Sequence, residues 1–340
     1  DHGYSVCVLE KNQQLGGCLQ VFSRDKTVFD TGVHYLPALD EGQPLHSYFK
    51  YFGLVDSVNW KKMDAAFDQI SFDDGYSYFH TSGWAEFEKN LIIDFPDEKS
   101  AILEYIRTIQ EIVKSFPLDE FRFSEKDHTD DALLQIGAND FINALTENTK
   151  LRAVLAGSNL LYAGTAEKCP LYVHALVTHG YLLSAYRCVD GGSQIAKSLA
   201  RSIREKGGEI HRRKSVVSFE KEGNELSAAV TSDGEKFKAK NFISNIQPKM
   251  LMQLIGKENM QRSYYNRMQK VQNTLSSFCI HIVCKPNSFK YLNHNIYHHV
   301  TENVWTNPDY REEEWPLSFM LCTPATSRSS EYAEGISILT

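Results

Sequence analysis

The sequence has no apolar run approaching the roughly 18–20 residues that a membrane-spanning helix needs. Positive charge is also not in excess, because 36 Lys and Arg face 43 Asp and Glu for a formal net charge of −7. This balance disfavours a nucleic-acid partner, since phosphate neutralisation requires a basic surface. The seven cysteines form no C-x-x-C pair, and Cys279 and Cys284 are the nearest two. We therefore expect free thiols in a reducing compartment, without a disulfide framework or a zinc site.

Motifs of hydrolytic and metal-dependent chemistry are missing as well. The sequence contains no H-E-x-x-H motif and no nucleophile elbow. Adjacent histidines at 298 and 299 would point to opposite faces of a strand, which is poor geometry for sharing a metal ion. The sequence therefore predicts no metal site, and it identifies no catalytic acid or base.

What is present is the composition of an ordinary globular protein, with 42% hydrophobic and 23% charged residues. At 340 residues the chain is long enough for about two domains.

The chain opens on half of a dinucleotide-binding pattern. Residues 4–10 read as a buried strand ending in an acid, Glu10, and Gly16-Gly17 follow. In a Rossmann unit, the acid that ends the second strand accepts hydrogen bonds from the adenosine ribose. A solvated strand end and a glycine turn explain the same residues equally well. Because the preceding glycine-rich turn needs about 20 more residues, we expect a fragment cut inside its cofactor site. At the other end of the sequence, we expect residues 335–340 to be a strand that is cut partway.

A second glycine pattern, Phe29-Asp30-Thr31-Gly32-Val33-His34, lies a short distance downstream. Gly32 would let the backbone pass close to a flat or anionic ligand. Asp30 and His34 could each hold this loop by hydrogen bonds, although either one alone is more often a structural residue.

Hydrophobic periodicity and turn residues predict the remaining elements. Aliphatic and aromatic stripes on the predicted helices indicate a core, with a lipid-like substrate tunnel as the alternative. A return to α/β character is expected after Gly191-Gly192, with Ser193 as the N-cap of a helix. The expected elements are a hairpin of 65–72 and 76–80, helices from Pro96 to Phe116, over 140–161 with a break near Asn148 and over 170–186, and strands at 209–211, 216–219, 225–231, 241–244, 277–285 and 317–322.

Together these segments resemble the FAD-dependent family of phytoene desaturases, carotenoid isomerases and retinol saturases. The matching motifs, in chain order, are Glu10-x5-Gly16-Gly17, Phe29-Asp-x-Gly-x-His34, Tyr186 through Gly191-Gly192-Ser193-x-Ile-Ala, and Phe242-Ile-Ser-Asn245-x-x-Pro248. Gly16-Gly17-Cys18 with the segment from Phe29 to Tyr35 looks most like the retinol saturase branch. The family's N-terminal G-x-G-x-x-G segment and its C-terminal flavin motif do not occur here, so the resemblance implies weak or no FAD binding by this fragment.

The resemblance also implies the fold and its division. The fold would be α/β, with a truncated FAD-binding Rossmann-like domain (GR2 type) and an α+β substrate domain that has an antiparallel sheet and a helical cap. The FAD-binding domain would comprise residues 1–40 and 186–255, and the substrate domain residues 41–185 and 256–340.

Roles for individual residues follow from the same resemblance. Glu10 would bind the adenosine ribose of FAD, and Gly16, Gly17 and the segment of Gly32 and His34 would lie along the cofactor. Val216 would contact the adenine through its backbone, and Asn245 would close the loop after a parallel strand. The substrate-pocket candidates are Gly191, Gly192 and Ser193.

The function implied is redox chemistry on C=C bonds of a long apolar polyene, in which the flavin exchanges a hydride. Saturation, desaturation and isomerisation stay open, and saturation would require an electron donor such as NAD(P)H. The alternatives are an amine-oxidase-like flavoenzyme and a non-catalytic protein that binds an isoprenoid or lipid. The expected partner is an apolar small molecule. The expected location is cytoplasmic with peripheral membrane contact through residues 84–95 or the helix after them, and the oligomeric state cannot be read from the sequence.

Overall fold

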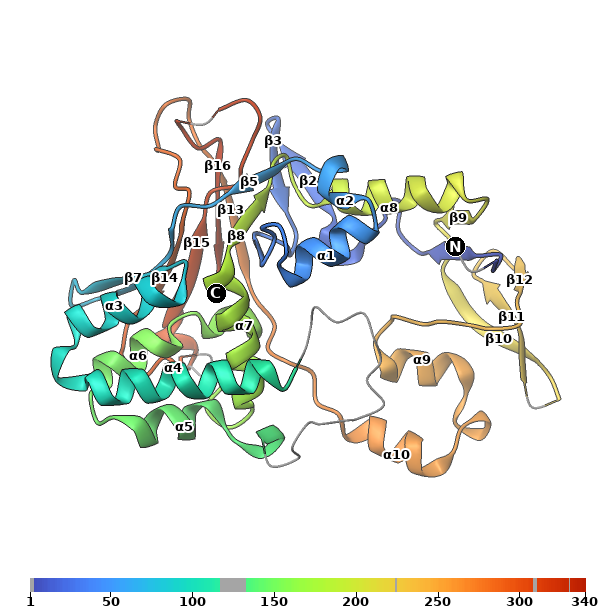
Figure 1. Ribbon diagram of the computed structural model, residues 1–340. Helices are drawn as coiled ribbons and strands as arrows, with labels where there is room; N and C mark the ends of the chain where they lie inside the picture. The colour runs from blue at the N-terminus through green and yellow to red at the C-terminus, as the bar shows by residue number, and fades with distance from the viewer. Residues whose placement is uncertain (1–2, 117–132, 224, 308–310, 330) are drawn as a thin grey trace. The chain divides into compact units, whose positions relative to one another are not determined.

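The structure is a computed structural model that describes residues 3–116, 133–223, 225–307, 311–329 and 331–340. Two compact units make up the chain, and each consists of two separated stretches of sequence (Figure 1). The smaller unit contains residues 1–17 and 196–274, and the larger contains 18–195 and 275–340. The functional division at residues 40, 185 and 255 stays a prediction.

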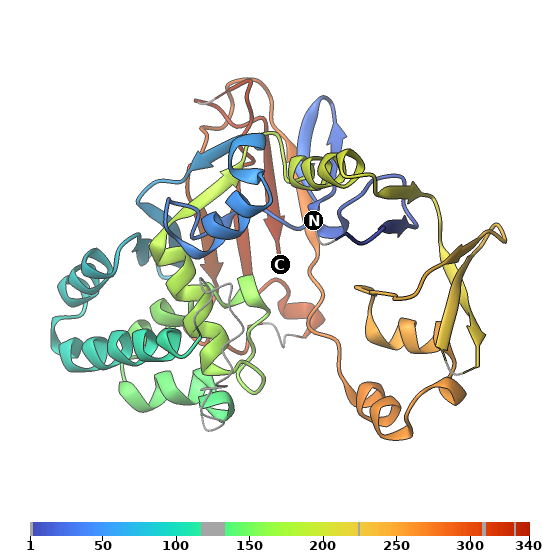
Figure 2. The same ribbon diagram turned by 45° about the vertical axis from the view of Figure 1, so that its right-hand side comes forward.

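The smaller unit contains the predicted parallel pairing. Strand β1 (Cys7–Glu10) runs parallel to β9 (Glu209–Arg212), with Glu10 opposite Arg212. The meander that follows is antiparallel and consists of β10 (Val216–Glu222), β11 (Glu225–Thr231) and β12 (Lys236–Lys238). Helix α9 (Pro248–Ile255) packs against β10, and α10 (Arg262–Lys270) lies next to α9 (Figure 2).

The strand predicted at residues 241–244 is wrong. These residues adopt no strand or helix. Ile243 is fully exposed, and Phe242 makes an edge-to-face contact with Phe219 at 5.7 Å between ring centroids. An apolar run forms a strand only where a neighbour pairs its backbone, and the described residues offer none to this segment. Asn245 therefore lies in a loop, but not directly after a strand.

A six-stranded mixed sheet organises the larger unit, in the order β13-β16-β15-β14-β6-β7. Only β14 and β6 pair in parallel. The hairpin predicted around Asp73-Asp74-Gly75 is confirmed as β6 and β7. The strands are β6 (Ala66–Phe72), β7 (Ser77–Thr81), β13 (Cys279–Val283), β14 (Asn295–His299), β15 (Ser318–Cys322) and β16 (Gly335–Leu339).

Five helices gather beside this sheet (Figure 1) and share one apolar core with it. The predicted break near Asn148 is confirmed, because the Asn148 side chain accepts the Leu151 N–H at 3.0 Å and caps a new helix. The helices are α3 (Trp84–Asp94), α4 (Lys99–Lys114), α5 (Ala138–Leu145), α6 (Thr149–Ala156) and α7 (Leu171–Leu183).

The rest of the larger unit consists of short elements. The hairpin of β2 (Val21–Arg24) and β3 (Thr27–Asp30) stands apart from a small sheet in which β8 (Ala185–Cys188) lies between β4 (Leu36–Pro37) and β5 (Trp60–Lys62). Helices α1 (Pro44–Tyr51) and α2 (Leu54–Ser57) lie between β4 and β5 in the sequence. Helix α8 (Ser193–Glu205) begins in the larger unit and ends in the smaller one. The 3-10 turns are Gly17–Leu19, Pro96–Glu98, Leu133–Gln135, Asn159–Tyr162, Lys257–Asn259 and Glu312–Glu314.

The expected α/β fold is confirmed. Of the helices in the described ranges, none combines the length and the apolar character that a bilayer crossing requires.

Candidate functional site

In the smaller unit, two of the candidate cofactor residues, Glu10 and Val216, lie at or near the carboxyl end of the parallel pair. Glu10 ends β1, its backbone oxygen accepts the Lys214 N–H at 2.9 Å, and its carboxylate accepts the Asn12 N–H at 2.7 Å. Ligands of open α/β sheets bind at this edge, and an acid here suits a ribose hydroxyl. The Asn12 bond fixes the carboxylate without enclosing it, since Glu10 is only half-buried.

Gly16 and Gly17 shape the turn that follows Glu10. Their φ angles are +105° and +54°, a region that side chains disfavour. Within 4 Å of the Cβ position of Gly17 there is nothing in the part of the chain that the structure describes. Gly17 is therefore required by the backbone conformation, not by packing.

Val216 begins β10 two residues after Lys214, whose backbone bonds Glu10. It is half-buried and pairs with Thr231. Asn245 belongs to the same unit and is exposed. The structure thus brings Val216 near the Glu10 strand end, and it shows no contact of Asn245 with Glu10 among the described residues.

In the larger unit, Asp30 joins two of the sequence motifs. Its carboxylate accepts the Gly192 N–H at 2.7 Å, in front of α8. Asp30 thus ties its own loop to the distant turn at Gly192 by a hydrogen bond. Burial raises the pKa of Asp30 to about 6, while the Gly192 N–H bond opposes the shift. Ser193 is buried. The sequence predicts it as the N-cap of the helix, but the structure makes it the first helical residue, a difference of one position.

Gly191 is required both by its backbone and by its neighbours. Its φ is +92°, and an added Cβ would lie 2.6 Å from Cγ1 of Val21 and 3.2 Å from Oδ1 of Asp30. The loop after β3 is equally tight, since a Cβ on Gly32 would lie 3.0 Å from Cβ of Cys18. The smallness of Gly32 thus has a packing cause, and its predicted ligand contact stays a prediction.

His34 carries the feature that best fits a bound cofactor. Its Nε2 is buried and finds no hydrogen-bond partner in the described ranges, which is rare for a buried polar atom. Burial lowers the pKa of His34 to about 4, helped by His281 and Arg187, so the imidazole is neutral at pH 7. A neutral nitrogen can donate to or accept from a polar ring edge. This unpaired atom fits the polar edge of a flavin ring.

Arg187 was missed by the sequence reasoning, although it lies only four residues before Gly191. Its side chain is 1% exposed. The guanidinium donates to the backbone oxygens of Thr323 and His294 and to the Asn295 side chain, while its Nε is unpaired among the described residues. A lone cation in the apolar strand Ala185–Cys188 was the signal available in the sequence.

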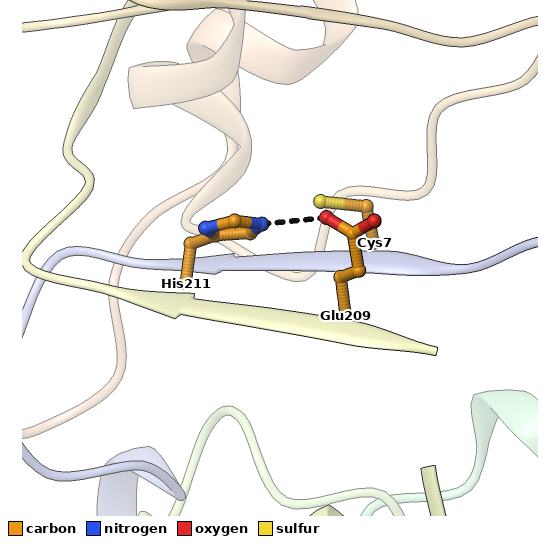
Figure 3. Close-up of side chains that lie close together, drawn as sticks. All are labelled: Cys7, Glu209 and His211. Carbon is orange, nitrogen blue, oxygen red and sulfur yellow. Dashed lines mark hydrogen bonds and ion pairs between the residues drawn. The ribbon is translucent and has the colours of Figure 1, made fainter. Parts of the chain in front are cut away.

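One group in the smaller unit has the donor atoms of a metal site. Cys7, Glu209 and His211 lie on the neighbouring strands β1 and β9, with their ligand atoms within 4.8 Å of one another (Figure 3). His211 Nε2 and Glu209 Oε2 are 2.8 Å apart. Burial and the carboxylates of Glu209 and Glu235 raise the pKa of Cys7, which disfavours a metal-binding thiolate at neutral pH. The absence of a metal site stays a prediction.

Comparison with known proteins identifies the family. Residues 1–321 match the family described as flavin containing amine oxidoreductase. The chain belongs to this family. The family implies a flavin cofactor. The roles of Glu10, of the glycine turns and of His34 toward that flavin stay predictions.

Among curated relatives, the all-trans-retinol 13,14-reductase of Danio rerio is 26% identical over 226 residues, covering 61% of this chain and 37% of that protein. The chain described here thus matches less than two fifths of the length of this relative. Two solved structures show the same fold over 99% of this chain: an oxidoreductase from Methanosarcina mazei (15% identity, TM-score 0.65, 73% of that chain) and a putrescine oxidase variant (11%, 0.66, 70%).

Proposed function

We propose that this chain forms part of an FAD-dependent oxidoreductase that acts on C=C bonds of a long apolar polyene. The observation that carries the proposal is the similarity to all-trans-retinol 13,14-reductases, at 24–27% identity over 226–243 residues. This relationship favours saturation of a retinoid-like substrate over desaturation or isomerisation. NAD(P)H is the proposed electron donor.

Flavin chemistry suits such a substrate, because bound flavin exchanges a hydride with carbon and needs no ionisable handle on the polyene. In this proposal Glu10 holds the adenosine ribose, Gly16 and Gly17 follow the cofactor, and Val216 contacts the adenine. His34 offers its unpaired Nε2 to the polar edge of the flavin. Asn245 keeps its proposed place in the cofactor-binding loop.

The larger unit would hold the substrate end of the site. Asp30 fixes the Gly191-Gly192 turn by its bond to the Gly192 N–H, and Ser193 is buried directly behind it. We propose that this turn limits one side of the substrate pocket. An apolar polyene would reach it from a membrane surface, so we propose a cytoplasmic protein with peripheral membrane contact.

The decisive experiment uses the full-length protein loaded with FAD. Its flavin is reduced with NADPH without oxygen, and all-trans-retinol is added while the flavin absorbance is followed. We expect reoxidation of the flavin and a saturated product. A saturated alcohol of equal chain length is the matched control and should leave the flavin reduced.

The amine-oxidase alternative predicts the reverse behaviour. Putrescine would then reduce the oxidised flavin, and the polyene would not reoxidise it. That result would overturn the proposed function, because the fold is shared by both classes and substrate alone separates them.

A further inference from the structure

Five buried side chains of the larger unit form one continuous hydrogen-bonded network: Arg187, Asn295, Asp68, Tyr35 and Tyr297. Arg187 Nη2 donates to Asn295 Oδ1 at 2.8 Å, and Asn295 Nδ2 donates to Asp68 Oδ1 at 2.9 Å. The Tyr35 hydroxyl donates to Asp68 Oδ2 at 2.9 Å and lies 2.7 Å from the Tyr297 hydroxyl. None of the five is more than 4% exposed. This buried network joins β6, β8, β14 and the segment between β3 and β4, and none of the sequence motifs indicates it.

Two neighbouring members of this network, Asp68 and Tyr35, differ in their surroundings. Asp68 lines a small cavity of about 10 Å³ together with His80, Ser158, Thr178 and Tyr181. This volume holds about one water-sized group, so it suits passage of a proton and excludes a polyene. Tyr35 directly follows His34, at the end of the motif assigned to the cofactor. The network therefore connects a small, mainly apolar cavity, which has a few polar groups on its wall, to the segment that contains His34.

Asp68 is the member of the network that changes charge near neutral pH. Burial raises the pKa of its carboxyl to about 7, against the Asn295 and Tyr35 bonds and the charge of Arg187. The tyrosines that face it, Tyr35 and Tyr297, have pKa values well above the usual 10 and stay protonated.

The other groups around Asp68 stay in one protonation state. Tyr181 on α7 has its pKa raised by burial, and His80 on the paired strand β7 has its pKa lowered by burial to about 4. At neutral pH His80 is uncharged, and Arg187 is the only cation bonded to the network among the described residues.

Hydrogen-bond directions allow a proton to move through this chain. With Asp68 ionised, Tyr297 donates to Tyr35 and Tyr35 donates to the carboxylate. With Asp68 protonated, its O–H can donate to Tyr35, and Tyr35 can then donate to Tyr297. The two states differ by the one proton on Asp68 and by the direction of the hydrogen bonds between the hydroxyl groups, as in any hydroxyl relay.

We propose that Asp68, Tyr35 and Tyr297 form a proton relay that delivers a proton to a conjugated C=C bond. The inference rests on the proposed function. A bound, reduced flavin would supply a hydride to one carbon of the double bond, and Tyr297, the last hydroxyl of the relay, would supply the proton to the neighbouring carbon. The products are a saturated bond, oxidised flavin and an Asp68 carboxylate, and the carboxylate takes up a proton from solvent through the small cavity.

The first test needs no turnover. Infrared spectra of the chain are compared between pH 5 and 9 for the wild type, Asp68→Asn and the control Asp64→Asn, which replaces an exposed carboxylate four residues away. We expect a protonated-carboxyl band that disappears near pH 7 in the wild type and in D64N. This band should be missing in D68N, in which the band of Asp30, with a pKa of about 6, remains at pH 5. A wild-type spectrum without this band overturns the relay.

The second test uses the full-length, FAD-loaded protein with all-trans-retinol. D68N and Tyr35→Phe should lower kcat by about 100-fold or more, the range of general acid catalysis, with KM unchanged and with loss of the solvent deuterium isotope effect. Y35F keeps the Asp68 carboxyl and so separates relay from folding. If both variants keep the kcat and the isotope effect of the wild type, the relay is overturned and the proposed function stands. If the wild type saturates no polyene, the proposed function fails, and the relay fails with it as a catalytic device.

Discussion

The two units hold their candidate residues in opposite ways. In the smaller unit, Glu10 and Gly17 lie on open backbone, half-buried or exposed, with a single bond from Asn12 to the carboxylate. In the larger unit, Gly191 and Gly192 are buried and crowded by neighbouring atoms. Similar glycine pairs thus serve different ends, since one permits a turn and the other permits close packing.

This contrast separates binding from folding. A residue that only contacts a ligand can change without loss of stability, whereas a packed residue affects stability whether or not it contacts the ligand. Substitutions in the two units should therefore give different ratios of stability loss to loss of flavin affinity.

The largest effect is expected from Gly191→Val. A valine would place Cβ against Val21 in a positive-φ backbone, and overpacking plus strain should lower the free energy of unfolding by roughly 4 kcal/mol. Gly42→Val is the matched control, because Gly42 has φ +82° and open space around it, so about 1–2 kcal/mol is expected. Urea unfolding of both variants decides the matter. Equal losses would show that packing around Gly191 contributes nothing.

A smaller effect concerns pH, where Asp30 and His34 should act in opposite directions. The pKa of Asp30 rises from 3.8 to about 6 on folding, so the folded state binds the proton more tightly, and this contribution to stability is lost as pH rises from about 4 to 6. The pKa of His34 falls from 6.5 to about 4 on folding, so the unfolded state binds the proton more tightly, and stability rises as pH rises from about 4 to 6.5. Each shift corresponds to about 3 kcal/mol.

Single substitutions should separate the opposite contributions of Asp30 and His34 to the pH dependence of stability. Between pH 4 and 6.5, Asp30→Asn should gain stability relative to the wild type, and His34→Phe should lose stability relative to it. Urea unfolding at the two pH values measures both, with Asp64→Asn as an exposed control that should follow the wild type. If the free energy of unfolding changed equally between the two pH values in all four proteins, the burial of Asp30 and His34 would be contradicted.

Local signals predicted much of the fold. The hairpin of β6 and β7 follows from a D-D-G turn between alternating residues, and the break at Asn148 follows from its side-chain cap. Residues 241–244 fail for the converse reason, because an apolar sequence cannot report whether a pairing partner exists.

The site could be predicted only where a motif is local. The glycine turns and Glu10 are visible as short patterns, whereas the bond from Asp30 to Gly192 joins residues 162 positions apart. Asp68, Asn295 and Tyr35 meet by the same kind of long-range contact. A charged residue within an apolar strand is a local sign of such a network, and both Arg187 in β8 and Asp68 in β6 carry it.

The smallest effect on stability, with a clear effect on binding, is expected from Glu10→Gln. Glutamine keeps an oxygen for the Asn12 N–H but loses the charge that strengthens a bond to ribose hydroxyls. The free energy of unfolding should change by less than about 0.5 kcal/mol, while the FAD affinity of the full-length protein should fall about 10-fold, equivalent to about 1.4 kcal/mol. Glu209→Gln, at the other end of the same strand pair, is the control and should bind FAD normally. If E209Q weakens FAD binding as much as E10Q, net charge and not the position of Glu10 determines the affinity.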